Sequence, residues 1–301
     1  MHEFVDPLRQ AGYDIELVYA GNLTGVREGC SSLARLRRET RGAAIVHAQY
    51  GSGCAALASL LPSSRVLTLR GSDWYGVASQ RRAGRGAIAP WLTRAVVRRF
   101  RHVVVVSNRM RRDVARFVGD GRISVLPSGI DLTRFFPRER MAARHALGED
   151  GDARPWVLFS SVADQNPVKR AELAQAAMHI VNRHRPEVQL KIMTGVERAL
   201  VPEFVSACNV ILLTSTHEGW PNIVKEGLAS NIPFVSTDVS DLAEIASREP
   251  SCAVTDADPD ALARALLDVL EASPANLRQY VEPMSMSRTA AKLASIYDAL
   301  A

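Results

Sequence analysis

The side chains best suited to chemistry in this sequence are two glutamates within one segment. Glu218 and Glu226 are separated by seven residues in TSTHEGWPNIVKEGLASNIPFVST, which spans residues 214–237. The apolar run that ends at Ser215 predicts a buried strand, and the Gly, Pro and Asn that follow predict a loop. A helix is expected to begin near Asn222. Glu218 would then lie in the loop and Glu226 in the first turns of the helix.

A strand-to-helix junction of this kind favours an anionic ligand. In doubly wound sheets, ligands bind where strands end and helices begin, and the unpaired amides of a helix N-terminus attract a pyrophosphate. Two neighbouring carboxylates can accept strong hydrogen bonds from sugar and ribose hydroxyls. The simpler alternative is that Glu218 complements the helix dipole while Glu226 is a solvated helix residue.

The elements that must position this junction follow from the alternation of apolar runs with helical patterns. The runs expected to be strands are residues 15–20, 43–48, 65–70, 102–107, 122–127, 156–161, 190–195, 210–215 and 232–237. Each is β-branched or continuously apolar, as strands covered on both faces should be. Ser107 and either Asp258 or Asp260 are expected to be helix N-caps.

This alternation predicts an α/β protein with two Rossmann-like domains, each built on a parallel sheet. The polar, turn-rich stretch 138–155 interrupts the pattern and marks the boundary. We expect an N-terminal domain in residues 1–140, a second domain in residues 141–285, and a final helix in residues 286–301 that can pack back toward the N-terminal domain.

The two halves of the chain differ strongly in charge. Residues 1–150 contain 24 Arg, no Lys and 13 acidic residues, a net charge of +11; the remainder contains 13 basic and 19 acidic residues, a net charge of −6, and the sum is +5. The basic half indicates an anionic partner. Arg94, Arg98 and Arg99 lie near Trp91, which suits a helix resting on an anionic bilayer. A solvated arginine face fits the same pattern, whereas no nucleic-acid-binding module is recognisable.

Composition argues against a membrane-spanning or disulfide-bonded protein. No stretch reaches the ~18 consecutive apolar residues of a membrane span, and the N-terminus lacks the pattern of a secretory signal. The four cysteines have neither pairing nor metal-ligand spacing, so a reduced cytoplasmic protein is expected. The pairs Asp150/Asp152 and Asp256/Asp258 lie in polar linkers and are interpreted as turn residues. We predict neither a metal nor a cofactor.

With these motifs in place, the sequence resembles the retaining glycosyltransferases of family 4, which have the two-domain GT-B fold with sheets facing across a cleft. The segment 214–237 resembles the donor-site motif of that family. VVVVSNRMRRDVARF and RISVLPSGIDLTRFFP, within residues 103–137, resemble the passage that closes its N-terminal domain, and LTLRGSDWYG, residues 67–76, resembles its acceptor-side stretch. The variant Glu-Gly-Trp-Pro-Asn-x-x-Lys-Glu is similar to a bacterial subgroup that builds cell-surface polysaccharides such as teichuronic acid.

The resemblance implies roles for individual residues. Glu226 should hold the nucleotide ribose, while Glu218 faces the donor sugar, with Lys169 and Arg170 supplying positive charge to the diphosphate. An exposed helix start is the alternative for Lys169 and Arg170. The residues implied in donor binding also include Gly219, Trp220, Pro221, Asn222, Gly195 and Val196, and those implied on the acceptor side are Arg70, Ser72, Asp73 and His47.

Three departures from the family pattern accompany the resemblance. Arg70 stands where the family has a histidine near the reaction centre, and arginine cannot act as a base at ordinary pH; His47 and His217 are the titratable alternatives. Residues 159–161 lack the arginine that usually precedes the lysine. The N-terminal domain is also expected to lack the first strand of the family.

The resemblance implies transfer of a hexose-type sugar from a nucleotide-sugar to a lipid-linked or glycan acceptor, with retention of configuration and without a metal. The expected location is cytoplasmic, peripheral at the inner face of the plasma membrane. Two alternatives stay open: a GT-B nucleotide-sugar epimerase, and a partner-dependent or inactive binding module, which the absent first strand would suggest.

Overall fold

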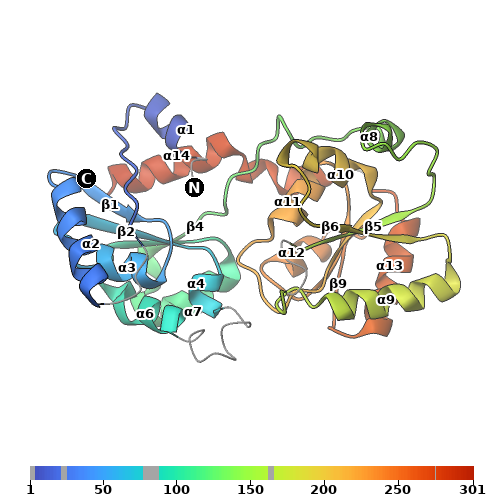
Figure 1. The fold of residues 1–301 in the computed structure, drawn as a ribbon, viewed down its shortest axis with the longest axis horizontal. Helices are drawn as coiled ribbons and strands as arrows, with labels where there is room; N and C mark the ends of the chain where they lie inside the picture. Colours follow the sequence, from blue (N-terminus) through green and yellow to red (C-terminus); the bar gives the residue numbers. More distant parts are fainter. Residues whose placement is uncertain (1–3, 22–25, 77–87, 162–165, 275) are drawn as a thin grey trace. The chain divides into compact units, whose positions relative to one another are not determined.

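The structure is a computed structural model that describes residues 4–21, 26–76, 88–161, 166–274 and 276–301. The chain divides into two compact units, Met1–Gly129 with Met286–Ala301, and Ile130–Ser285. Residues 130–140, expected in the N-terminal domain, thus belong to the second unit, and the final helix belongs to the first. Each unit contains one parallel sheet covered by helices, so the predicted class of two Rossmann-like domains is confirmed (Figure 1).

The first unit is built on a four-stranded parallel sheet of order β1-β2-β3-β4. Its strands are β1 (Ile45–Ala48), β2 (Ser64–Leu69), β3 (His102–Val105) and β4 (Ile123–Val125). Its helices are α1 (Val5–Gln10), α2 (Val26–Glu39), α3 (Ser52–Ala58), α4 (Ser72–Tyr75), α6 (Ile88–Val96), α7 (Asn108–Val118) and α14 (Met286–Asp298), with 3₁₀ turns η3 (Val97–Arg99) and η4 (Asp120–Arg122). Helices α1 and α14 pack on the sheet through a core that includes Phe4, Val104 and Leu293.

The predicted strand at residues 15–20 is wrong. This segment is not assigned to a strand, and its apolar side chains Leu17 and Tyr19 are exposed. The carbonyl oxygens of Ile15 and Tyr19 accept hydrogen bonds from the guanidinium groups of Arg9 and Arg35. A strand requires a neighbouring backbone to satisfy these groups, and here two arginines satisfy them instead.

The second unit is built on a five-stranded parallel sheet of order β6-β5-β7-β8-β9. Its strands are β5 (Trp156–Ser160), β6 (Gln189–Met193), β7 (Val210–Leu213), β8 (Phe234–Thr237) and β9 (Ala253–Thr255). Its helices are α8 (Arg140–Ala146), α9 (Ala171–His184), α10 (Val201–Ala207), α11 (Asn222–Ala229), α12 (Leu242–Ala246) and α13 (Pro259–Glu271), with 3₁₀ turns η5 (Arg198–Leu200), η6 (Leu277–Tyr280) and η7 (Glu282–Met284).

Burial of the central strands on both faces explains their continuous apolar sequences. Val157, Val210 and Val235 face a core shared with α9 and α13, while Ile211 and Phe234 on the same strands are equally buried. Full burial of such side chains contributes roughly 1.5–3 kcal/mol each.

The predicted N-caps are confirmed at Ser107, which accepts from the Met110 amide, and at Asp258, which accepts from the Ala261 amide.

Candidate donor site at the end of the second sheet

The strand order of the second unit creates a point where the chain changes direction. The connection after β5 leads to β6 on one side, whereas β7 pairs with β5 on the other. Loops that leave the carboxyl ends of β5 and β7 therefore diverge and leave room for a ligand. Lys169 lies in the connection after β5, and Glu218 lies in the connection after β7. The topology thus brings these two predicted residues to one edge of the sheet.

Lys169 and Glu218 form an ion pair at this edge. The Lys169 Nζ atom lies 2.7 Å from Glu218 Oε1, and the Ser215 hydroxyl donates to the same oxygen over 2.7 Å. Their side chains retain 18% and 19% of their exposure, so solvent still reaches both. The pair can therefore exchange one partner for a ligand without first exposing a buried charge.

Side chains hold two carbonyl oxygens of the loop that follows β7. Thr237 Oγ1 donates to the Ser215 carbonyl and Ser240 Oγ donates to the Gly219 carbonyl, each over 2.7 Å. The amides of Glu218, Gly219 and Trp220 make no hydrogen bond within the described residues, nor do the first two amides of α11. Amides without protein acceptors at the start of a helix form a binding site for an anion.

The side chains of the other predicted loop residues divide into buried and exposed. Trp220 and Pro221 are buried, and the Lys225 Nζ atom lies 5.8 Å from the centre of the Trp220 ring. Only Asn222 has an exposed side chain among residues 219–222. Gly219, Trp220 and Pro221 can therefore meet a ligand through the backbone, as the resemblance implied, rather than through side chains.

Glu226 lies one turn into α11, and its carboxylate is only partly exposed. Burial raises the pKa of the Glu226 carboxyl, while the cations of Lys225, Arg134 and Arg198 act in the opposite direction. Within the described residues, no donor forms a hydrogen bond to this carboxylate. A partly buried carboxylate without a hydrogen-bond donor is well suited to accept hydrogen bonds from ligand hydroxyls.

Two further predicted donor-side residues lie just after β6. Gly195 adopts a left-handed backbone conformation with φ of 62°, and a side chain there would meet nothing within 4 Å. Val196 follows in the same loop and is half-buried. Because β6 is parallel to β5, this loop leaves the same edge of the sheet as Lys169.

Arg170 is predicted to contact the diphosphate, but its guanidinium bonds to backbone carbonyls of the neighbouring loop. Its Nε donates to the Thr214 carbonyl over 2.5 Å, and its Nη2 donates to the Ser215 carbonyl over 2.9 Å. Burial lowers the pKa of the Arg170 guanidinium. Two of the three guanidinium nitrogens thus bond to the backbone, which favours a role in holding the loop over the predicted direct contact with a diphosphate.

The predicted acceptor-side residues lie in the first unit, around the ends of β1 and β2. Arg70 donates to the Gln49 carbonyl, to the Gln49 side chain and to the Ser128 hydroxyl. The Ser72 hydroxyl bonds to the Tyr50 hydroxyl over 2.8 Å. The cavity beneath Arg70 has a volume of about 10 Å³, which is the space of a single water molecule.

Asp73 is fully buried, at 0% exposure. Its carboxylate accepts hydrogen bonds from the amides of Gly51, Arg70 and Gly71 over 2.9–3.2 Å. Burial raises the pKa of the Asp73 carboxyl, and these amide hydrogen bonds oppose the rise. The environment gives Asp73 a structural function in fixing the loop after β2, in place of the predicted contact with an acceptor.

The two candidate histidines are also engaged. His47 Nδ1 lies 2.6 Å from the Tyr297 hydroxyl, and His47 Nε2 lies 2.7 Å from Thr68 Oγ1. Burial, together with Arg70 and His102, lowers the pKa of the His47 imidazole to about 3. His217 Nδ1 lies 3.0 Å from Thr216 Oγ1 in the loop before Glu218. His47 is therefore a neutral part of the packing of α14 on the sheet.

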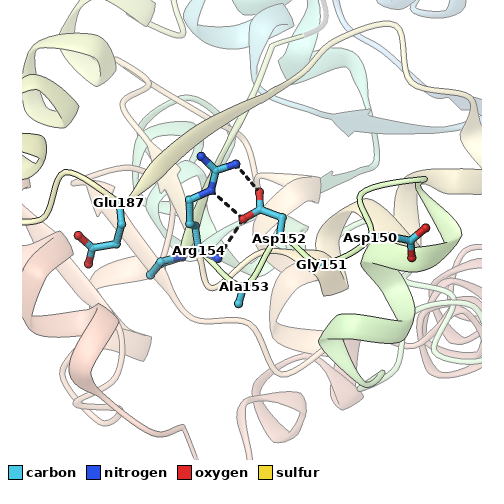
Figure 2. A pocket seen from close by; sticks show the side chains of 7 residues that line it. Asp150, Gly151, Asp152, Ala153, Arg154 and Glu187 are labelled. Atoms are coloured by element: carbon cyan, nitrogen blue, oxygen red, sulfur yellow. Dashed lines mark hydrogen bonds and ion pairs between the residues drawn. The ribbon is translucent and has the colours of Figure 1, made fainter.

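One hollow in the described part of the chain lies away from this chemistry. It has a volume of about 620 Å³ and is lined by residues 150–155 and Glu187 (Figure 2). These residues precede β5 and β6, so the hollow is at the opposite edge of the sheet from Lys169. Asp152 accepts from Arg154 and from the Trp156 indole, and the bond from Arg154 lowers the pKa of the Asp152 carboxyl.

Two properties of the described chain bear on metals and membranes. Across residues 4–301 with the gaps given above, no group of three His, Cys, Asp or Glu side chains is arranged to hold a metal ion. In the same part of the chain, no helix combines the length and the apolar character needed to cross a bilayer.

Comparison with known proteins gives matches over most of the chain. The family described as Glycosyltransferase Family 4 matches residues 2–134, and the family described as Glycosyl transferases group 1 matches residues 162–272. A putative teichuronic acid biosynthesis glycosyltransferase, TuaC, from Bacillus subtilis (strain 168) is 25% identical over 241 residues, which cover 74% of this chain. The match spans 60% of the length of that relative.

Solved structures share the fold. Sucrose-phosphate synthase from Thermosynechococcus elongatus superimposes with a TM-score of 0.74 at 17% identity, covering 94% of this chain and 82% of its own. Anabaena HepE in complex with UDP and glucose also gives a TM-score of 0.74, at 13% identity, covering 98% of this chain and 88% of its own. The chain therefore belongs to the glycosyltransferases, with a family 4 region in its N-terminal part and a group 1 region in its C-terminal part.

Proposed function

We propose that this chain is a retaining glycosyltransferase whose second unit binds a nucleotide-sugar. The observation that carries the proposal is the arrangement at the ends of β5 and β7. There, unpaired amides and Lys169 provide positive potential for a diphosphate, while Glu226 offers a carboxylate without a hydrogen-bond donor. Preorganised amides and a cation stabilise charge that develops on a departing diphosphate. Metal independence is part of the proposal, since these groups supply that charge themselves.

Thermal shift with UDP-, GDP-, ADP- and dTDP-sugars tests donor binding, because a ligand that binds the folded state raises its stability. The UDP complex of the Anabaena structure makes UDP-sugars the first choice. We expect Lys169→Ala and Glu226→Ala each to weaken binding by about 10-fold or more, the value of a charge-assisted hydrogen bond. Lys292→Ala and Glu244→Ala, at exposed positions of α14 and α12, are the matched controls. Unchanged affinity in both site variants would refute the assignment.

Release of free nucleotide, measured with and without acceptor, tests the reaction. A transferase requires an acceptor for rapid turnover, whereas a nucleotide-sugar epimerase converts the donor without one. An inactive binding module would bind the donor and release nothing under either condition. The acceptor that we propose is lipid-linked or a growing surface glycan, in keeping with the basic N-terminal half and with the name of the Bacillus relative.

We further propose that the enzyme works at an anionic membrane surface through α6 and η3. Ile88 and Trp91 are 54% and 66% exposed, and the exposed Arg94, Arg98 and Arg99 lie in the same two elements. Residues 88–122 contain nine Arg and two Asp, a net charge of +7. Exposed apolar side chains beside arginines suit the headgroup region of an anionic bilayer.

Co-sedimentation with phosphatidylglycerol vesicles tests this surface, with phosphatidylcholine vesicles as the neutral control. Replacing Arg94, Arg98 and Arg99 by Gln should release the protein from anionic vesicles. A matched triple variant, in which the exposed Arg183, Arg248 and Arg264 of the second unit become Gln, removes the same charge and should stay bound. Equal binding by the two triple variants would dismiss the surface, whatever the enzymatic activity.

A further inference from the structure

Arg170 has a backbone conformation that is unusual for its residue type. It precedes α9 with φ of 51° and ψ of 58°, in the left-handed region that residues other than glycine and asparagine rarely adopt. A non-glycine residue stays in this region when surrounding contacts hold it there. Its guanidinium makes two such contacts, to the carbonyls of Thr214 and Ser215.

The contacts run in both directions between the two loops of the donor site. Thr214 Oγ1 shares its proton between the Lys169 carbonyl, at 2.5 Å, and the Arg170 carbonyl, at 3.1 Å. The Thr216 amide donates to the Val168 carbonyl over 2.9 Å. Five hydrogen bonds therefore join residues 168–170 to residues 214–216. We call this set of hydrogen bonds the loop clamp.

The residues of the loop clamp are close in sequence to the two residues of the ion pair. Lys169 precedes Arg170 in one loop, and Glu218 follows Ser215 in the other. Thr214 and Ser215 are buried, and Arg170 is half-buried. Movement of either loop would change the distance between Lys169 Nζ and Glu218 Oε1, which is 2.7 Å here. A cation displaced by about 1 Å from its best position loses much of its effect on a ligand.

We propose that Arg170 is a positioning residue, which acts on the donor diphosphate through Lys169 by means of the loop clamp. This inference rests on the proposed function for the identity of the ligand. It differs from direct contact, because a residue that acts through Lys169 has no effect once Lys169 is absent. The clamp also predicts that Thr214, which carries no charge, influences the affinity for a diphosphate.

A double-mutant cycle separates the two roles. Arg170→Gly removes the side chain while keeping a residue that adopts this backbone conformation readily. The ligand is the diphosphate, among UDP, GDP, ADP and dTDP, that gives the wild-type protein the largest thermal shift. We expect Arg170→Gly to weaken its binding about 10-fold in calorimetry, and less than about 2-fold in the Lys169→Ala background. Equal effects in both backgrounds would mean that Arg170 contacts the diphosphate itself, which overturns the proposal.

Substitutions at Thr214 provide a test without a change of charge. Thr214→Val removes the hydroxyl with little change of shape and should weaken binding several-fold, whereas Thr214→Ser keeps the hydroxyl and should bind like the wild type. Arg183→Ala, at an exposed position of α9, is the control for loss of an arginine close in sequence to the clamp. Wild-type affinity in Thr214→Val would contradict the clamp.

Hydrogen exchange without ligand keeps this inference separate from the proposed function. In Arg170→Gly and in Thr214→Val, the amides of a peptide spanning residues 214–221 should exchange faster than in the wild type. If the wild-type protein binds none of the four diphosphates while exchange increases, the proposed function fails and the clamp stands. Unchanged exchange in both variants overturns the clamp.

Discussion

Acid should destabilise the first unit through His47. The imidazole in the folded protein has a pKa of about 3, lowered by burial and by Arg70 and His102. An unfolded chain has the ordinary histidine pKa of about 6.5. Between these values, the unfolded state binds a proton that the folded state does not. The contribution of the neutral His47 to the free energy of unfolding is therefore fully present above pH 6.5 and is lost as the pH falls toward 3.

The size of the effect follows from this difference. Each pH unit below 6.5 removes about 1.4 kcal/mol, so lowering the pH from 7.5 to 5 should reduce the free energy of unfolding by about 2 kcal/mol through His47. Carboxyl groups titrate over part of this range as well. The variant His47→Gln retains all of those carboxyl groups, so the difference between its pH dependence and that of the wild type isolates the histidine.

The free energy of unfolding has to be measured for each unit separately, because a chain of two domains does not unfold in one step. Met110 in the first unit and Met178 in the second are 0% and 5% exposed, so each becomes open to oxidation when its unit unfolds. A short pulse of hydrogen peroxide across a urea series, followed by mass spectrometry of the two peptides, reports both stabilities. Equal pH dependence of the Met110 transition in wild type and His47→Gln would refute the reasoning.

The remaining predictions concern substitutions that disturb buried polar groups. Oxidation of Met110 and Met178 across the urea series measures their effect on the free energy of unfolding of each unit. Asp73→Ala leaves three amides without their acceptor and should cost the first unit about 3–5 kcal/mol, with Asp73→Asn costing about half as much. Gly51→Ala should cost about 1–3 kcal/mol, because the added Cβ would lie 2.5 Å from Thr93 Oγ1. Arg144→Met should cost the second unit about 2–4 kcal/mol, since the carbonyl of Ala207 loses its donor and Trp156 loses its stacked guanidinium. A Met110 or Met178 transition unchanged from the wild type would contradict the corresponding estimate.

The sequence predicted the central strands well because their residues are buried on both faces. Residues 156–161 and 210–215 are continuous apolar runs, and they contain β5 and β7. It missed β9, Ala253–Thr255, which has three half-buried residues at the edge of the sheet and therefore lacks an apolar run. It also predicted a strand at residues 15–20, where pattern alone could not reveal that two arginines bind the carbonyl oxygens.

The candidate site was predictable where one short segment carries it. The strand–loop–helix pattern predicts Glu218 and Glu226 as site residues, and the structure shows that Glu218 pairs with Lys169. The contact between Arg170 and Thr214 spans 44 residues and depends on a left-handed backbone. No local pattern encodes such a contact. In the same way, the sequence predicts Asp73 as an acceptor-side residue, because no local pattern reveals its burial or its hydrogen bond from the Gly51 amide.

The anion site depends on where the carbonyl oxygens of the loop are directed. Ser240 Oγ holds the Gly219 carbonyl by a hydrogen bond over 2.7 Å. The C=O and N–H groups of one trans peptide unit point in opposite directions. The amide of Trp220, which shares its peptide unit with the Gly219 carbonyl, is therefore directed away from Ser240 and stays available. By fixing this peptide unit, Ser240 favours positive potential on the ligand side through the backbone. The ammonium group of Lys169 then adds one positive charge to a backbone that already favours a diphosphate.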